Sequence, residues 1–153
     1  MSRRIVLGIT LALLVVGLAA IPAGADATYH STHIALTPVR DAPLRTGFVE
    51  NIHANGPTVF AHENYVVNGG IPNTDFQVEI SVFVGDTTCA GQPSFTLPTA
   101  TLTTNAAGNG QAQHVFTPDD ASGVRNTVDG ARWTLSANGA ATYTSGCEVI
   151  SLD

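Results

Sequence analysis

Residues 76–84 read Phe-Gln-Val-Glu-Ile-Ser-Val-Phe-Val, the most regular pattern in the chain. Apolar side chains alternate with Gln, Glu and Ser, which is the two-residue period of a β-strand. Because one face is apolar and the other polar, we expect a half-buried strand of an antiparallel sheet. Phe83 interrupts the polar face, and we expect it to cover a loop or to mark a contact surface.

The same period recurs at residues 131–137. Ala131, Trp133 and Leu135 share one face, while Arg132 and Thr134 share the other. A tryptophan buries a large apolar area when it faces the interior. We therefore expect Trp133 to anchor the core.

Weaker alternation predicts seven further strands. They are Thr32–Thr37, Gly47–Ala54, Val59–Val67, Phe95–Thr103, Gln111–Thr117, Ala141–Thr144 and Glu148–Leu152. Turn residues such as Asn138-Gly139 separate them. Pro98 cannot donate a hydrogen bond to a ladder, so its strand is expected at an edge or at a bulge. About 7–9 short strands predict an all-β fold, which we interpret as one immunoglobulin-like antiparallel β-sandwich over residues 26–153.

The first 25 residues are predicted to form a secretory signal peptide. Two arginines precede the uncharged apolar run 5–21, and small residues follow up to Ala25, where we expect cleavage, or alternatively after Ala27. An uncleaved membrane anchor and a twin-arginine export signal are the alternatives for this segment. The chain has no second apolar run. We expect a secreted protein, extracellular or periplasmic, that keeps no stable membrane anchor after cleavage.

The composition excludes several functions. After Ala25 the chain carries twelve acidic residues against Arg40, Arg45, Arg125 and Arg132, a formal charge of −8, and it contains no lysine. A nucleic-acid-binding protein needs a basic surface, so nucleic acid is not an expected partner. The absence of lysine also excludes Schiff-base chemistry.

The two cysteines, Cys89 and Cys147, predict a disulfide bond, because an exported chain folds in an oxidising compartment. Cys89 follows the strongest strand and Cys147 precedes the last one. The bond is therefore expected to fix the C-terminal strand to a loop at one end rather than to cross the core. The alternative is a pair of free thiols at a reactive site.

The histidines raise the question of a metal site. If the strands on either side of Asn55-Gly56-Pro57 pair without a bulge, His62 faces Asn51 and lies diagonally from His53 on the same face. A metal between these two rings needs a third ligand. In this register Glu50 and Glu63 lie on the other face of the sheet and cannot be the third ligand. His53 and His62 are therefore also explained as two polar residues on a solvated face. We predict no metal site and no cofactor, with His53 and His62 as the candidates if one exists.

Two segments resemble the opening strands of the copper–zinc superoxide dismutase-like sandwich. They are Gly47-Phe48-Val49 and the run from Tyr65 to Thr74. The resemblance implies a sandwich fold and a closely spaced His-x-His ligand pair after these segments. Residues 76–84 contain no histidine, so the metal site does not carry over. A His-based metalloprotein with this sandwich is the alternative function.

No nucleophile motif occurs in the chain, neither Gly-x-Ser-x-Gly nor His-Glu-x-x-His. His114 alternates with Ala112 and Phe116, so we expect it to be half-buried. A half-buried histidine can be a functional group with a shifted pKa, or it can be a structural residue at the edge of the core. We therefore predict that the protein is not an enzyme. It is expected to be an exported binding or structural surface module, whose rows of Thr and Asn suit a protein or carbohydrate partner at the cell surface.

Overall fold

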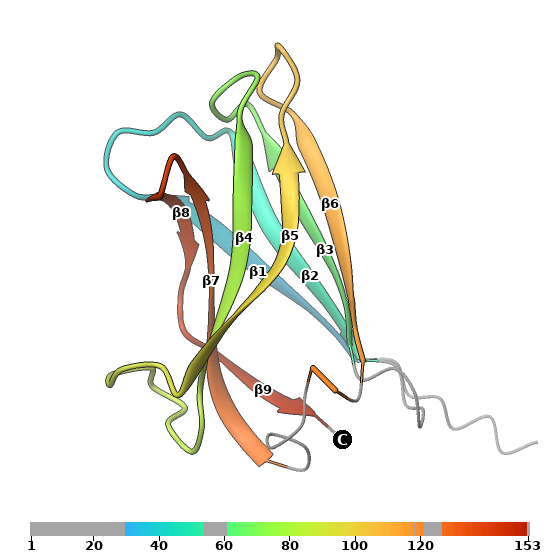
Figure 1. The fold of residues 1–153 in the computed structure, drawn as a ribbon, viewed down its shortest axis with the longest axis vertical. Helices are drawn as coiled ribbons and strands as arrows, with labels where there is room; N and C mark the ends of the chain where they lie inside the picture. The colour runs from blue at the N-terminus through green and yellow to red at the C-terminus, as the bar shows by residue number, and fades with distance from the viewer. Residues whose placement is uncertain (1–29, 54–60, 118, 121–126, 153) are drawn as a thin grey trace, which may run out of the picture.

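The computed structural model describes residues 30–53, 61–117, 119–120 and 127–152, and these residues form nine β-strands. The strands are β1 (His30–Pro38), β2 (Thr46–His53), β3 (Ala61–Asn68), β4 (Asp75–Phe83), β5 (Phe95–Thr103), β6 (Gly110–Phe116), β7 (Thr127–Ala137), β8 (Ala140–Ser145) and β9 (Glu148–Leu152). Each matches one of the strands expected from the sequence (Figure 1). The predicted signal peptide, residues 1–25, lies outside the described residues.

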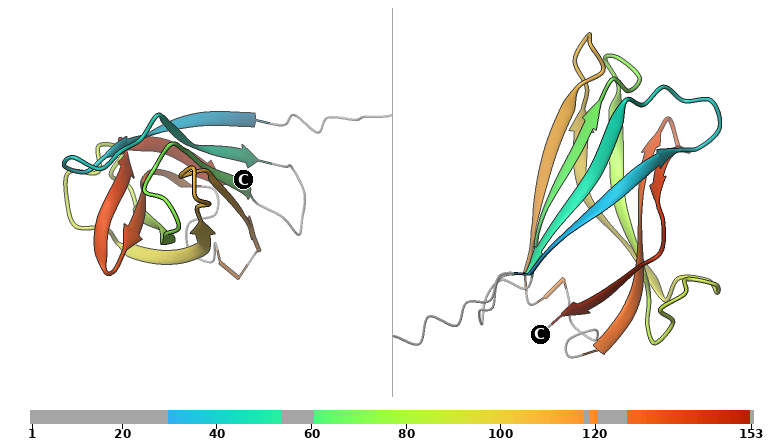
Figure 2. Two further views of the ribbon diagram at one scale, coloured as in Figure 1. Left: turned by 90° about the horizontal axis from the view of Figure 1, so that it is seen from above. Right: turned by 180° about the vertical axis from the view of Figure 1, so that it is seen from behind.

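All strand pairs are antiparallel and belong to one sheet in the order β5-β4-β7-β8-β1-β2-β3-β6, with β9 paired to β7. The sheet curls until its two ends approach each other. β5 and β6 lie side by side near the loop that joins them and diverge with distance from it (Figures 1 and 2). The all-β prediction is confirmed as a nearly barrel-like sheet, whereas an immunoglobulin-like sandwich is not confirmed.

β1 and β7 make the curvature possible because each changes partner along its length. Residues 30–35 of β1 pair with β2, and residues 36–38 pair with β8. One edge of β7 pairs with β8 at residues 134–137 and with β9 at residues 127–131. The sheet therefore turns a corner at β1, and its two halves face each other.

The core lies between these halves. Phe76, Val78, Trp133 and Leu135 are fully buried, as their alternation predicted. Val84 differs from the expected pattern and is 44% exposed, because β4 ends at Phe83 and the chain turns away at Gly85 with φ 70°.

The bulge expected near Pro98 is present. β5 is an end strand of the order, and its register shifts opposite Val78 and Glu79, so that Ala100 pairs with Val78 and Pro98 with Glu79. The unpaired residue is Thr99, whose hydroxyl donates to the Val78 carbonyl at 3.2 Å. Proline therefore lies next to the bulge of an end strand, one of the places where strands tolerate it.

Phe83 is 3% exposed although it lies on the outer face of β4. The guanidinium of Arg132 lies 5.8 Å from the centre of its ring, in the geometry of a cation–π contact. Its neighbours on this face, Gln77 and Ser81, are more exposed, as expected. Phe83 is thus covered at the end of the strand rather than open to solvent.

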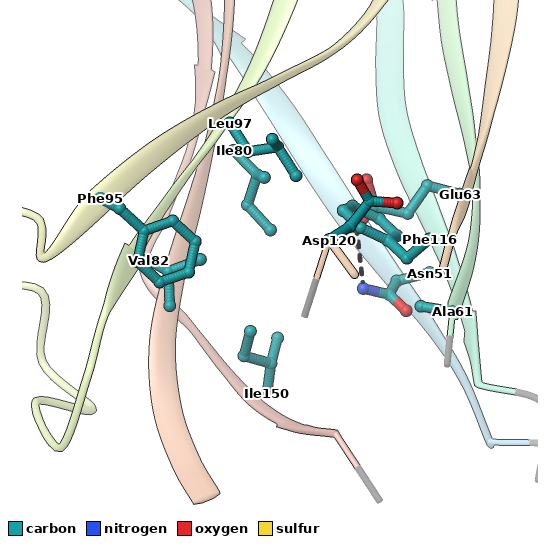
Figure 3. Close-up of a pocket in the computed structure, with 10 residues that line it drawn as sticks. All are labelled: Asn51, Ala61, Glu63, Ile80, Val82, Phe95, Leu97, Phe116, Asp120 and Ile150. Atoms are coloured by element: carbon teal, nitrogen blue, oxygen red, sulfur yellow. Dashed lines mark hydrogen bonds between the residues drawn. The ribbon is translucent and has the colours of Figure 1, made fainter. Parts of the chain in front are cut away.

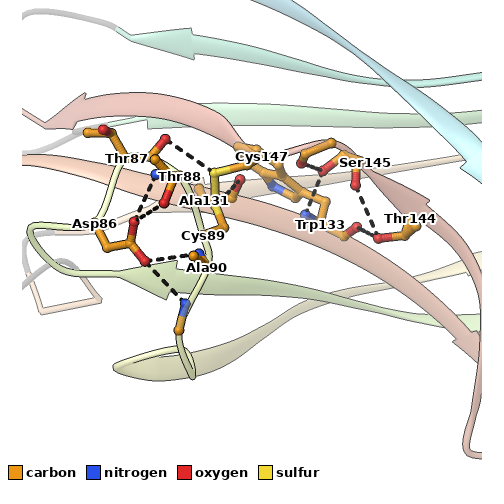
Figure 4. The surroundings of a disulfide bond; sticks show 12 residues. Asp86, Thr87, Thr88, Cys89, Ala90, Ala131, Trp133, Thr144, Ser145 and Cys147 are labelled. Atoms are coloured by element: carbon orange, nitrogen blue, oxygen red, sulfur yellow. Dashed lines mark hydrogen bonds between the residues drawn. A yellow bond between two sulfur atoms is a disulfide. The ribbon is translucent and has the colours of Figure 1, made fainter.

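Cys89 and Cys147 form the predicted disulfide, with Cα atoms 5.7 Å apart (Figure 4). Cys89 lies in the β4–β5 connection and Cys147 between β8 and β9, so the bond links one end of the sheet to the last strand as expected. Gly130 of β7 lies beneath it. A Cβ atom at Gly130 would come within 2.3 Å of the Asp86 carbonyl and 2.9 Å of the Cys89 sulfur.

The described part of the chain contains no helix of the length and apolarity that a membrane span requires.

Candidate functional site

Three polar side chains form a row across the inner face of β2, β3 and β6. The register pairs Asn51 with Glu63 and Glu63 with His114. Asn51 is 3% exposed and Glu63 is fully buried. Because residues two apart share a face, Glu63 lies in phase with Ala61 and Tyr65, which face the core.

The Glu63 carboxylate accepts three hydrogen bonds. The Tyr65 hydroxyl donates to Oε2 at 2.5 Å, and the indole Nε1–H of Trp133 donates to the same oxygen at 2.8 Å. The Asn51 amide donates to Oε1 at 3.0 Å. Trp133 belongs to β7, so this carboxylate joins the two halves of the sheet across the core.

Burial raises the pKa of Glu63 to about 7, because the charged form loses its hydration inside the protein. The hydrogen bonds from Tyr65 and Trp133 favour the charged form and offset part of this effect. Burial and the neighbouring Glu63 charge also raise the pKa of the Tyr65 hydroxyl, which therefore stays protonated and acts as a donor. Glu63 is thus a carboxyl that changes charge near neutral pH.

Two atoms of the row have no hydrogen-bond partner among the described residues. They are Oδ1 of Asn51 and Nε2 of His114, and both are inaccessible to solvent. The His114 ring packs edge-on against Phe116 with ring centres 4.5 Å apart. Buried polar atoms of this kind are uncommon in native proteins and call for a water molecule or a ligand.

A pocket opens beside this row; its enclosed part has a volume of about 20 Å³, and the total is about 370 Å³ with the open space at its mouth (Figure 3). Asn51 and Glu63 provide polar atoms on one side, and β4 and β5 provide apolar side chains on the other. The ten lining residues are Asn51, Ala61, Glu63, Ile80, Val82, Phe95, Leu97, Phe116, Asp120 and Ile150. Apolar walls with a few convergent polar groups are typical of small-molecule sites.

Asp120 is the second carboxylate of the pocket. The backbone N–H and the hydroxyl of Thr117 donate to it, each at 2.8 Å, and these bonds lower its pKa. Asp120 therefore stays ionised while Glu63 titrates. The ten lining residues include no Arg and no His, so no lining side chain balances the two carboxylates.

The register expected for the two candidate metal ligands is wrong. Ile52, not Asn51, pairs with His62, so positions 53 and 62 are out of phase. Residues 53–61, an odd number, lie between Ile52 and its partner His62. The expected register assumed an even number between paired residues, and one residue of difference exchanges the faces of a strand. Among the described residues no group of three His, Cys, Asp or Glu side chains is placed to hold a metal ion.

The same register places the two carboxylates of β2 and β3 on opposite faces. Glu50 lies on the outer face, where it accepts hydrogen bonds from Ser31 and, at 2.9 Å, from His33. These contacts lower its pKa, with the Ser31 bond as the largest cause. Glu50 is thus an ordinary surface carboxylate next to the buried Glu63.

Glu63 and Asp120 are the site residues that the sequence reasoning did not select for binding. A signal for Glu63 was present, because Ala61, Tyr65 and Val67 place it in phase with an apolar face. The expected register concealed this signal by assigning Glu63 to the face opposite Asn51. Asp120 had no comparable signal, since its place depends on how the chain leaves β6.

Comparison with known proteins found no relative: no family model, no curated protein and no solved structure matches the chain.

Proposed function

We propose that the protein is an exported, non-catalytic binding protein that holds a small and largely apolar ligand in the pocket beside Glu63. The pocket itself carries this proposal. It combines walls from six strands with a buried carboxylate and an amide oxygen that has no partner among the described residues. A buried amide oxygen without a partner beside such a space calls for a bound water or ligand atom.

The lining lacks the hydroxyl, thiol and imidazole groups of the most common nucleophiles, and this favours a binding role over a catalytic one. The ten lining side chains provide two carboxylates and one amide, but no hydroxyl, thiol or imidazole. Glu63 already accepts three hydrogen bonds, which hold it in place. These features suit recognition of a ligand by fixed groups.

Export is part of the proposal. The disulfide is compatible with an oxidising compartment outside the cytoplasm, as is the leader-like composition of residues 1–25. We also propose that the curled sheet is a variant of the immunoglobulin-like sandwich. The alternative of a His-based metalloprotein gains no support, because the register separates His53 from His62.

The proposal is tested by titrating the purified, oxidised protein with three probes that share a phenethyl body. Phenethyl alcohol is neutral, 3-phenylpropionate is an anion and phenethylammonium is a cation. The chain has one tryptophan, so the single indole N–H resonance of Trp133 reports on the pocket without ambiguity. We expect at least one probe to shift this resonance saturably.

Ala61→Leu fills the pocket from within and is expected to weaken that binding by roughly tenfold or more. Ala35→Leu adds the same atoms on an exposed strand position and is expected to leave binding unchanged. If circular dichroism shows that Ala61→Leu does not fold, Ala61→Val takes its place. A resonance that none of the probes moves, or full affinity in the filled variant, contradicts the binding site.

The non-catalytic part is tested with esters, glycosides, peptides and superoxide as substrates. We expect no turnover above that of the heat-denatured protein. Turnover that Glu63→Gln or Asp120→Asn abolishes in a folded protein would show that the pocket is an active site instead.

A further inference from the structure

We propose that the ligand of this pocket is a small organic cation, a primary or secondary ammonium attached to an apolar body. This inference rests on the proposed function and specifies its ligand class. It comes from the charge of the lining, from the hydrogen-bonding atoms that lack a partner, and from the aromatic walls.

The charge of the pocket favours a cation. Glu63 and Asp120 both line it, and none of the other eight lining residues is Arg or His. Both carboxylates repel an anion and attract a positive charge, and the attraction is strongest at Glu63, which is fully buried so that little water screens it. The chain beyond residue 25, with formal charge −8, adds to this attraction over longer distances.

The free hydrogen-bonding capacity specifies a donor. Oδ1 of Asn51 is buried and has no partner among the described residues, and Oε1 of Glu63 accepts only the bond from the Asn51 amide. Both atoms are acceptors, so the complementary group must carry N–H or O–H bonds. An ammonium group is about the size of the one water molecule that the enclosed part of the pocket holds, and its N–H bonds suit these acceptors, whereas a quaternary ammonium has no N–H bond to offer.

The apolar residues at the mouth of the pocket face the rest of the ligand. Phe95, at 36% exposure, and Phe116, which is buried, come from strands on the two sides of the pocket. Aromatic rings attract cations through their faces as well as burying apolar surface. Ile80, Val82 and Leu97 complete a wall with no polar side chain.

The three phenethyl probes separate this inference from the proposed function. We expect phenethylammonium to bind at least roughly tenfold more tightly than phenethyl alcohol, because a charge-assisted bond to Glu63 is present only with the amine. We expect 3-phenylpropionate not to bind. If the alcohol or the propionate binds as well as the amine, the cation inference is wrong while the binding function stands. If no probe binds, both fail.

Matched variants locate the charge. Glu63→Gln keeps the shape of the side chain and is expected to remove the preference for the amine over the alcohol. Glu50→Gln deletes a carboxylate from the outer face of the adjacent strand and is expected to keep the preference. If Glu63→Gln retains the full preference, Glu63 does not recognise the cation.

A pH titration of the unmodified protein gives a second measurement that needs no folded variant. The groups around Glu63 are Asn51 on β2, Tyr65 on β3, His114 on β6, Asp120 beyond β6 and Trp133 on β7. Binding of phenethylammonium is expected to tighten as the pH rises from 5.5 to 8.5, roughly tenfold or more, because Glu63 loses its proton over this range. Affinity that is flat or weakens over this range contradicts the inference.

Discussion

Glu63 shows what a buried carboxyl requires at the scale of one residue. Removing an ionised carboxylate from water is unfavourable unless donors replace the lost hydration. Tyr65, Trp133 and Asn51 provide three donors, and none of them is a cation. The group therefore keeps a pKa of about 7 instead of the ordinary value of 4.5.

This displaced pKa predicts a stability that falls with rising pH. The folded state holds its proton more tightly than the unfolded chain between pH 4.5 and about 7, so the contribution of Glu63 is fully present below pH 4.5 and is lost across this window. We expect the unfolding free energy of the wild type to fall by roughly 3 kcal/mol relative to that of Glu63→Gln as the pH rises from 4 to 8. Denaturant unfolding at several pH values measures this difference.

Glu50→Gln provides the control for that series, because the pKa of Glu50 is lowered and its contribution has the opposite sign. If the unfolding free energies of the wild type and of Glu63→Gln change in parallel over the whole pH range, Glu63 has an ordinary pKa and the prediction is wrong.

Trp133 combines a packing role with a donor role, and two substitutions separate them. Trp133→Ala removes a fully buried side chain and is expected to lower the unfolding free energy by about 3–5 kcal/mol. Trp133→Phe keeps an aromatic ring but deletes the bond to Glu63, with an expected loss of about 1–3 kcal/mol. Far-ultraviolet circular dichroism in denaturant measures both. Equal stability of Trp133→Phe and wild type would contradict the role of the indole N–H.

At the scale of the elements, the disulfide is the strongest local constraint. It closes a loop with a sequence separation of 58 and is expected to stabilise the fold by about 4 kcal/mol through the entropy of the unfolded chain. The unfolding free energy of the double variant Cys89→Ser with Cys147→Ser, compared with wild type, tests this value. Mass spectrometry after alkylation provides the check on the bond. Two alkylated thiols in the unreduced wild type would show that the bond does not form.

Gly130 predicts a steric effect beneath the same bond. Gly130→Ala places a methyl group within 2.3 Å of the Asp86 carbonyl, so backbone or sulfur atoms must move. We expect a loss of about 1–3 kcal/mol in thermal or denaturant unfolding. Gly91→Ala is the control, since its Cβ meets only Asp86 Oδ2 at an ordinary 3.8 Å. Equal stability of the two variants would contradict this packing.

The nine strands could be predicted because their signal is local. Alternation within each strand and turn residues such as Asn138 and Gly139, both with positive φ in the β7–β8 hairpin, are contained in a few neighbouring residues. The register between β2 and β3 could not be predicted in the same way. One residue more or less between two strands exchanges their faces, and this alone decided whether Glu63 faces the core or the solvent.

At the scale of the whole molecule, the site exists because the sheet curls without closing. The two end strands, β5 and β6, meet at their shared loop and diverge with distance from it (Figure 1). The pocket draws its lining from six different strands and from Asp120. No stretch of sequence contains this convergence, which is why the pocket could not be read from the sequence even where each strand could.

The central claim is that a titrating carboxylate joins the two halves of the sheet through Trp133. The most direct measurement follows the indole N–H resonance of Trp133 against pH. We expect one titration with a midpoint near 7 in the wild type, retained in His114→Gln and absent in Glu63→Gln. A resonance that does not move between pH 5 and 9, or that moves equally in Glu63→Gln, would contradict the claim.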